Sequence, residues 1–502
     1  MKITFVANGC EQLPISLLAA IAQRQGHQVG LAFSSSLFND RYGLNIPKLA
    51  SFFDDRNNVI EAIREQAPDV LACSVLSNLN QWMLGIAREA KEMLPHLKVI
   101  FGGVHPSAVP GKVLENPEVD FVCVGEGDIA FPQLLRELEN GGPNHPLPNI
   151  HYHNEDGTLI QGPQSGFIQD LDSLPFFDKQ LWEDHIRIGD LYMTMASRGC
   201  PYRCTFCFNS YFANLPGKNG GKYVRQRSVE HMIGELREAK KRYTLRFIDF
   251  EDDVFTFNKA WLSKFLDLYK KEINVPFMCL THPRYMDDDI AKWMADAGCQ
   301  WVQMGIQSVD DSYKLKQLKR NENSDHVLKA MDALKKNRIQ LKTDHIFGLP
   351  GEELSSQQKA LEFYATYTPN RISTFWATYF PGTILVDQAK NLGFLTEADV
   401  QKIESGHSHA YHDSGNVKES ELLFYQGYEV LFKMFPLLPP AIRMRLSPKV
   451  FERLNFSATQ KLGVVFELAN ALIKRSPDHY AYGMHYQHTI KNTFAKLLRN
   501  SV

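Results

Sequence analysis

Short runs of apolar, often β-branched residues alternate with amphipathic segments over residues 1–140. A short apolar run is typical of a strand buried on both faces, whereas apolar positions three and four residues apart indicate a helix. The expected strands are 3–7, 29–33, 69–74, 99–101 and 121–124, and the expected helices are 14–25, 59–66 and 81–94. This alternation predicts a parallel, doubly wound, Rossmann-like sheet, which binds ligands beyond the carboxyl ends of its strands.

A second alternation of strands and helices occupies residues 186–390. The expected strands are 192–196, 246–250, 277–280, 301–306, 341–346 and 372–378, and the expected helices are 229–242, 259–271, 288–297, 324–336 and 355–367. In the helix 324–336, Ser324 is placed to cap the N-terminus. Six βα units predict a partial (β/α)6 barrel rather than a closed barrel of eight.

The remaining segments lack both patterns. Residues 141–185 are rich in Gly, Pro, Asn and Asp, which predicts a linker with one hairpin around residues 154–157. Residues 391–502 lose the strand pattern and are expected to form a C-terminal helical domain. The expected fold class is therefore α/β, with a Rossmann-like domain at 1–140, a linker at 141–185, a partial barrel at 186–390 and helices at 391–502.

Composition narrows the class of partner. A net charge of −2 and a hydrophobic fraction of 44% are typical of a soluble globular protein, with no basic field that favours nucleic acid or anionic lipid. The sequence has no uninterrupted run of about 18 apolar residues, so it predicts no membrane span. The chain opens with strand-like sequence rather than a signal peptide. We therefore expect a cytoplasmic protein that acts on a small molecule.

Three of the eight cysteines are crowded together. Cys200, Cys204 and Cys207 follow an expected strand with the spacing C-x3-C-x2-C, which can bring three thiolates to one face of a loop. Three thiolates suit an iron–sulfur cluster that keeps one iron open for another ligand. Structural zinc prefers four protein ligands, commonly from two paired motifs, and no second cysteine pair is present. Zinc and unliganded core cysteines are the alternatives.

With Phe206 in the aromatic position, this segment resembles the radical S-adenosylmethionine (SAM) superfamily, whose signature is C-x3-C-x-aromatic-C. The resemblance implies a 4Fe–4S cluster on the three cysteines, with Phe206 beside the adenine of SAM. In that family the open iron binds the amino and carboxylate groups of SAM. Reductive cleavage of SAM then yields a 5′-deoxyadenosyl radical, which abstracts a hydrogen atom from the substrate.

Three later segments, 247–255, 305–308 and 344–352, extend the resemblance, and all lie at expected strand ends. By analogy, Asp252 or Asp253 is expected to contact the amino group of SAM, with solvated loop carboxylates as the alternative. Gln307 and Ser308 are expected near the ribose or methionine part of SAM. Arg284 is expected either to pair with the SAM carboxylate or to be a solvated surface residue.

Two glycine-bearing turns in the N-terminal domain resemble those of the cobalamin-binding subgroup of the superfamily. Glycines there let the backbone approach a bulky ligand closely. The expected cobalamin contacts are Gly102, Gly103, His105, Gly125, Glu126 and Gly127. The motif D-x-H-x-x-G is absent from residues 1–145, so cobalamin is expected without a protein imidazole on cobalt. His105 is then expected to cap its turn or to contact phosphate.

The resemblance implies a cobalamin-dependent radical SAM enzyme that methylates an unactivated carbon of a small molecule, through a 5′-deoxyadenosyl radical and methylcobalamin. One alternative is a cyclase, or another enzyme that forms or rearranges carbon–carbon bonds without net methylation, similar to the anaerobic magnesium-protoporphyrin ester cyclases. Another is a cobalamin- or redox-responsive binding protein with a vestigial cluster. A flavodoxin or ferredoxin is the expected reductant, in an anaerobic or micro-aerobic setting.

Two C-terminal features each allow two interpretations. The apolar segment 430–442 is expected either to pack in the core or to receive a lipid or tetrapyrrole. His407, His409 and His412 are expected either to lie in an exposed loop or to bind a metal.

Overall fold

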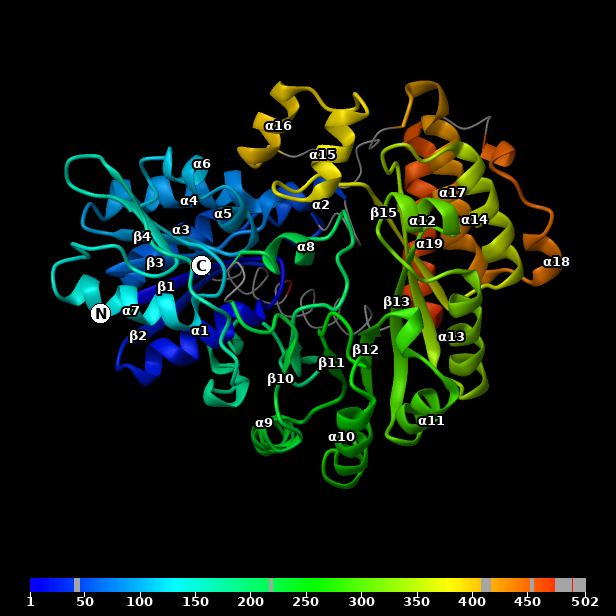
Figure 1. The fold of residues 1–502 in the computed structure, drawn as a ribbon, viewed down its shortest axis with the longest axis horizontal. Coiled ribbons are helices and arrows are strands. Elements are labelled where there is room, and N and C mark those ends of the chain that lie inside the picture. Colours follow the sequence, from blue (N-terminus) through cyan, green and yellow to red (C-terminus); the bar gives the residue numbers. More distant parts are fainter. Residues whose placement is uncertain (40–45, 216–219, 408–416, 452–455, 475–489, 491–502) are drawn as a thin grey trace, which may run out of the picture.

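The computed structural model describes residues 1–39, 46–215, 220–407, 417–451, 456–474 and 490. Two sheets lie side by side in Figure 1, the N-terminal one in blue and cyan and the second in green. The orange C-terminal helices pack against the last strands of the second sheet.

The first sheet has the strand order β2-β1-β3-β4-β5-β6-β7. Its strands are β1 Lys2–Asn8, β2 Gln28–Ser34, β3 Val70–Ser74, β4 Lys98–Gly102, β5 Phe121–Cys123, β6 Ile150–His153 and β7 Leu159–Gln161. Strands β1 to β5 are parallel, which confirms the predicted doubly wound sheet. The predicted hairpin, β6 and β7, extends this sheet in antiparallel fashion because Ile150 and Tyr152 bury their side chains in its core. The range expected as a linker therefore supplies two strands.

Helices cover both faces of the first sheet. They are α1 Leu13–Arg24, α2 Pro47–Phe52, α3 Arg56–Gln66, α4 Asn80–Met93, α5 Val104–Ala108, α6 Pro110–Leu114 and α7 Gly127–Glu139. Helix α7 was not expected, because it begins in a glycine turn and contains Pro132, a residue that usually interrupts helices. Its apolar residues Phe131, Leu134 and Leu135 are nevertheless buried against α1 and the sheet.

The second sheet has six parallel strands in the order β15-β14-β13-β12-β11-β8, which confirms the predicted partial barrel. Its strands are β8 Tyr192–Thr194, β11 Ile248–Phe250, β12 Phe277–Thr281, β13 Cys299–Gln307, β14 Gln340–Phe347 and β15 Arg371–Trp376. The short strands β9 Ser197–Arg198 and β10 Arg225–Gln226 form a separate antiparallel pair at its entrance.

Helices alternate with the barrel strands as predicted. They are α8 Asn209–Phe212, α9 Val229–Arg242, α10 Lys259–Glu272, α11 Asp288–Asp296, α12 Asp311–Lys316, α13 Ser324–Lys336 and α14 Leu354–Thr366. The cap of α13 differs from expectation: Asn323, not Ser324, accepts a hydrogen bond from the His326 N–H at 3.1 Å. Ser324 instead donates its N–H and hydroxyl to Asp311, since it lies one residue too late to reach the free N–H groups of the first turn.

The described part of the C-terminal region is helical, as expected. Helix α15 Ile384–Asn391 leads from the barrel into this region, whose own helices are α16 Glu397–Glu404, α17 Leu422–Met434, α18 Pro440–Arg443 and α19 Phe456–Lys474. Within the apolar segment 430–442, Leu431, Phe432 and Phe435 are fully buried, and the Phe432 ring lies 5.5 Å from that of Phe347 in β14. Core packing therefore accounts for the first half of that segment, whereas Ile442 is exposed.

His407 is exposed, and His409 and His412 lie outside the described residues. None of the helices that the structure describes is both long enough and apolar enough to span a lipid bilayer.

Candidate functional site

The three cysteines lie in a loop that follows β9, at the carboxyl end of the first barrel strand. The Cys207 N–H donates to the Cys204 carbonyl at 3.0 Å, which closes a turn between the second and third cysteine. Thr205 holds this turn to the segment after α12, through its N–H to Leu318 O at 3.1 Å and its hydroxyl to Gln317 O at 2.9 Å. The loop is therefore held both by β9, which precedes it, and by the segment that follows α12. Cys204 is buried, and Cys200 and Cys207 are partly exposed.

Burial opposes the charged form of all three thiols. It raises the pKa of Cys200 to about 12 and that of Cys207 to about 11, with Asp253 adding to the rise at both, and it raises the pKa of Cys204 as well. The thiols are therefore neutral near pH 7 unless bound cations compensate the thiolate charge, as metals do in protein sites.

The arrangement of these donors fits a cluster better than a single ion. In the described part of the chain, no three His, Cys, Asp or Glu side chains converge as ligands of one metal ion. The thiolates of an iron–sulfur cluster each bind a different iron, so they need not meet at one point. Three cysteines with this spacing can hold three irons and leave the fourth open.

A buried cation that the sequence analysis missed lies beside the second cysteine. The Arg320 guanidinium has Nη1 at 3.8 Å from the Sγ of Cys204, and its Nη2 donates to Gly305 O at 2.8 Å. Its Nε donates to Glu322 at 2.6 Å, and Glu322 also lies 3.1 Å from His282 Nε2. Burial favours a higher pKa for Glu322, but the His282 hydrogen bond and the Arg320 charge lower it to about 2. Glu322 is thus a permanent counter-ion for Arg320.

The imidazole of His282 in turn stacks on the ring of Tyr202, within the cysteine loop, with 3.9 Å between ring centroids. Arg284, the expected partner of the SAM carboxylate, lies outside this stack and is exposed, with its Nη1 at 3.5 Å from Asn321 O. This position is typical of the solvated alternative rather than of a buried anion contact.

The two candidate aspartates after β11 differ sharply in their surroundings. Asp252 is fully buried and accepts from the Ala196 N–H at 3.0 Å and from the Ser197 hydroxyl. It therefore ties the end of β11 to the strand that leads into the cysteine loop, and burial raises its pKa to about 6. Asp253 accepts from Asn209 Nδ2 at 2.8 Å, and the same nitrogen lies 3.7 Å from the Sγ of Cys207. Asp253 is the aspartate beside the cysteines.

An apolar group lines the side of the loop that carries Phe206. Phe206 packs with Leu318, Leu349 and Leu385, which come from three separate segments. The Leu385 N–H also donates to Thr205 O at 2.9 Å, so α15 is attached directly to the cysteine loop. This group offers an apolar surface suited to a flat aromatic ring.

The end of β13 is irregular where two SAM contacts were expected. The pairing register with β14 shifts between Gly305 and Gln307, and Gln307 has a φ of 67°. A Cβ on Gly305 would lie 2.3 Å from Gln307 Nε2, so glycine is required for the Gln307 side chain to fold back there. Ser308 donates to Glu352 at 2.9 Å. Glu352 is half-buried in the segment that follows β14, and loss of solvation there raises its pKa to about 8.

The glycine turns of the first domain form a polar cradle at the carboxyl ends of β3 and β4. Gly103 has a φ of 95°, and a Cβ there would lie 2.8 Å from Val75 N. His105 is fully buried, with Nδ1 at 3.0 Å from Ser77 Oγ. The Oδ1 atoms of Asn78 and Asn80 are buried without a hydrogen-bond partner. Such orphaned polar atoms are uncommon in proteins and fit a polar ligand.

Burial lowers the pKa of His105 to about 4, and the nearby Glu404 carbonyl offsets this only in part. His105 is thus a neutral imidazole whose Nδ1 lies within hydrogen-bond distance of the Ser77 hydroxyl. In the other turn, Gly125 has a φ of 81° and donates its N–H to Ser107 Oγ at 2.9 Å, and Gly127 begins α7. The Glu126 carboxylate is already engaged by Arg225, at 2.7 and 2.8 Å.

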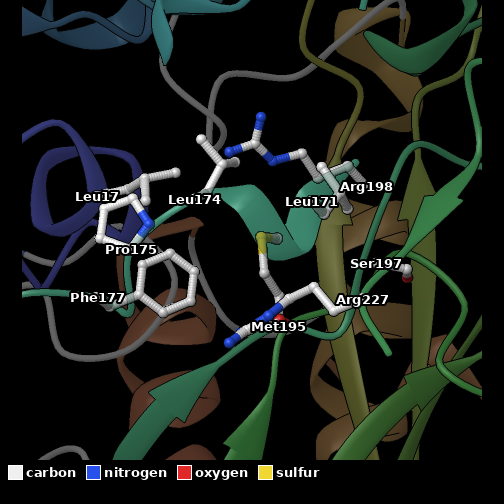
Figure 2. A pocket seen from close by; sticks show the side chains of 9 residues that line it. All are labelled: Leu17, Leu171, Leu174, Pro175, Phe177, Met195, Ser197, Arg198 and Arg227. Atoms are coloured by element: carbon white, nitrogen blue, oxygen red, sulfur yellow. Dashed lines mark hydrogen bonds between the residues drawn. The ribbon is translucent and has the colours of Figure 1, made fainter. Parts of the chain in front are cut away.

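A small pocket is lined by Met195, Ser197 and Arg198 together with Leu17 of α1 (Figure 2). Its volume of about 20 Å³ holds about one water molecule. It therefore has no room for a substrate.

Two family models match the chain. Residues 4–135 match the B12 binding domain, and residues 195–364 match the radical SAM superfamily. Each match lies within one of the two α/β ranges predicted from the sequence.

Several curated proteins are similar to the chain. An uncharacterized methyltransferase of Pyrococcus horikoshii is 25% identical over 78% of this chain and 83% of its own length. The cytidylyl-2-hydroxyethylphosphonate methyltransferase of Streptomyces wedmorensis is 22% identical over 76% and 78%. The anaerobic magnesium-protoporphyrin IX monomethyl ester cyclase of Rubrivivax gelatinosus is 23% identical over 65% and 59%.

Two solved structures share the fold at 15% sequence identity. The cobalamin-dependent SAM radical enzyme OxsB, with aqua-cobalamin and SAM bound, has a TM-score of 0.67 and covers 93% of this chain and 71% of its own. The radical SAM methyltransferase TsrM of Kitasatospora setae, with tryptophan and a SAM analogue bound, has a TM-score of 0.60 and covers 76% and 75%.

The Arg320 charge generates a redox prediction. In Arg320→Met, the reconstituted protein should show a more negative cluster reduction potential, because hydrogen bonds to sulfur and nearby positive charge favour the reduced cluster. Arg320→Lys keeps the charge and is the matched control, with a smaller shift. The measurement is a redox titration followed by electron paramagnetic resonance (EPR). A potential unchanged in Arg320→Met would show that this charge does not act on the cluster.

The raised pKa of the half-buried Glu352 generates a pH prediction. Its folded pKa of about 8 lies above the ordinary value for glutamate, so the folded state binds the extra proton and loses stability as pH rises through that interval. Glu352→Gln keeps the shape and removes the titration. The free energy of unfolding of Glu352→Gln minus that of the wild type should therefore increase from about pH 5 to about pH 8. Denaturant titrations at both pH values check this; a constant difference would contradict it.

Proposed function

Because the chain joins a B12-binding domain to a radical SAM domain, it belongs to the cobalamin-binding subgroup of the radical SAM superfamily, and we propose that it methylates an unactivated carbon of a small molecule. Membership of these two domain families implies that the cofactors are a 4Fe–4S cluster, SAM and cobalamin. The enzyme is thus a cobalamin-dependent radical SAM enzyme, and carbon methylation is the proposed outcome.

The observation that carries the proposal is the contact between the cysteine loop and the glycine turns. Tyr211, just after the loop, donates its hydroxyl to the Ser107 carbonyl at 2.8 Å. A Cβ on Gly125 would lie only 3.8 Å from Leu215 Cδ1. The proposed cluster site and the proposed cobalamin site therefore lie next to each other. Two cofactors held close together can act on one bound substrate without separate binding steps.

We propose site roles on the basis of these surroundings. Cys200, Cys204 and Cys207 bind the cluster, and Phe206 with its apolar neighbours receives the adenine of SAM. Asp253 rather than Asp252 contacts the amino group of SAM, because both oxygens of Asp252 already accept hydrogen bonds from the chain.

Further proposed contacts lie at the two domain edges. Gln307 and Ser308 lie on the ribose or methionine side of SAM. Gly102, Gly103 and His105 approach cobalamin together with Gly125 and Gly127.

When bound, the cluster supplies the electron that cleaves SAM, and cobalamin supplies the methyl group. The residues of this chain orient and protect these reactants. Asp252 holds the entry to the cysteine loop, and Arg320 balances negative charge at Cys204. The Phe206 group excludes water from the side where a carbon radical must survive. We also propose that a flavodoxin or ferredoxin delivers the electron in an anaerobic cytoplasm, through the partly exposed side of Cys200 and Cys207.

A cyclase or other non-methylating enzyme is the second candidate, because two of the similar proteins are anaerobic cyclases, one of them that of Rubrivivax gelatinosus. The alignment with that cyclase covers 59% of its length, whereas the two methyltransferases align over 83% and 78% of theirs. The more extensive similarity supports the methyltransferase proposal.

Labelled SAM distinguishes the candidates. The anaerobically reconstituted protein with cobalamin, methyl-labelled SAM and a strong reductant is incubated with a small-molecule extract of its host. Methylation predicts label in an extract component, together with S-adenosylhomocysteine and 5′-deoxyadenosine. A cyclase predicts 5′-deoxyadenosine without labelled product. A binding protein with a vestigial cluster predicts neither. The variant with alanine at all three cysteines is the control and should lack 5′-deoxyadenosine.

A further inference from the structure

Two arginines lie opposite each other at the entrance to the cysteine loop. Arg198 of β9 and Arg225 of β10 are paired in register in the antiparallel β9–β10 strands. Their side chains are 20% and 3% exposed, so water screens them poorly. Like charges directly opposite in a strand pair are destabilising, and more so where water is scarce. This pair therefore requires counter-ions.

Both counter-ions come from the other domain. Arg198 donates from Nη1 and Nη2 to the two carboxylate oxygens of Asp128, at 2.6 and 2.9 Å. Arg225 makes the same bidentate contact with Glu126, donating from Nη1 and Nη2 to its two carboxylate oxygens at 2.8 and 2.7 Å. Arg198 Nη1 also lies 3.3 Å from Glu126 Oε1. Paired hydrogen bonds between guanidinium and carboxylate fix orientation as well as distance. Glu126, Asp128, Arg198 and Arg225 form a neutral set that we call the interdomain clamp.

Each half of the clamp is held within its own domain. Glu126 and Asp128 lie at the N-terminus of α7, where the helix dipole favours negative charge. Arg225 donates to the Ile168 carbonyl at 3.0 Å, and its guanidinium lies 4.8 Å from the Phe167 ring centroid. The clamp thus also holds the segment that leads from the first sheet into the barrel.

The clamp lies very close to both expected cofactor sites along the chain. Arg198 precedes Cys200 by two residues, and Glu126 and Asp128 flank Gly127 in the glycine turn after β5. Few rotatable backbone bonds separate the charges from the groups that would hold the cluster and cobalamin. The Tyr211–Ser107 hydrogen bond provides a second contact between the same edges, so together they restrict rotation of one domain against the other.

We propose that the interdomain clamp sets the spacing and orientation of cobalamin relative to the cluster, and that Arg198 and Asp128 are positioning residues for methyl transfer. The role in transfer rests on the proposed function, whereas the spacing itself does not. Hydrophobic residues can replace buried ion pairs without loss of stability in other proteins. What the charged set adds here is a single geometry between two domains.

The test measures that geometry directly in the holoenzyme. Reduced cluster and cob(II)alamin each carry an unpaired electron, so pulsed EPR reports the distribution of distances between them. The wild type should give one narrow distribution. Asp128→Asn and Arg198→Met should each bind iron and cobalamin in full and give a broader or shifted distribution. The doubly reversed variant, Asp128→Arg with Arg198→Asp, should narrow it again.

Arg242→Met is the matched control, because Arg242 makes a two-pronged pair with Glu183 at 2.7 and 3.1 Å away from the clamp. Its distance distribution should equal that of the wild type. Clamp variants whose distribution stays as narrow and centred as the wild type would overturn the proposal, as would a reversed double variant broader than both single variants.

If methylation is observed, the ratio of methylated product to 5′-deoxyadenosine should fall about tenfold or more in the single variants, since a small misplacement costs that much. An unchanged ratio despite a broadened distance would overturn the role in transfer alone. Absence of methylation in the wild type would overturn the proposed function and leave the distance result to decide the clamp.

Discussion

The structure depends on one electrostatic constraint, which is the placement of three cysteine thiols in a buried loop where their charged form is unfavourable. Burial raises the pKa of each thiol, and neighbouring Asp253 further opposes the ionisation of Cys200 and Cys207. Bound irons relieve this, because a metal stabilises the thiolate that binds it. The surrounding chain assists, with Arg320 at Cys204 and Asn209 at Cys207 as the nearest hydrogen-bond donors. These two donors therefore act together with bound irons in favour of the buried thiolates.

The same balance of charge extends to the domain boundary. The β9–β10 pair that leads into the loop carries two buried arginines, and their counter-ions belong to the glycine turn of the first domain. The carboxyl ends of both sheets consequently meet, although each sheet follows its own α/β topology. In open α/β sheets these edges bind ligands. The meeting of two such edges is what makes joint action on a single substrate physically reasonable.

Much of the fold was predictable because its strands are buried on both faces and its helices have one apolar face. The cysteine spacing and its aromatic residue carried the cofactor prediction, since those signals are local. Helix α7 was missed because it contains Gly127 and Pro132, which are uncommon inside helices. The cap of α13 was assigned to Ser324 rather than Asn323. Both errors concern a residue whose preference yields to its tertiary surroundings.

Long-range contacts were beyond the sequence analysis. No local pattern distinguishes Asp252 from Asp253. They differ in their partners, which are Ala196 and Ser197 for Asp252 and Asn209 for Asp253. Arg320 lies in the charged run 319–322, which looks solvent-exposed in the sequence but is partly buried beneath the cysteines. The Arg225 partner of the Glu126 carboxylate was not foreseen either, since the two residues are 99 positions apart. In each case the deciding partner lies far away in the chain.

The most direct test of the account is the EPR spectrum of the reduced, anaerobically reconstituted protein before and after addition of SAM. Three irons bound to Cys200, Cys204 and Cys207, with the fourth open, predict a cluster signal that changes when SAM binds that iron. The same signal in protein with alanine at all three positions, or a signal indifferent to SAM, would contradict the account.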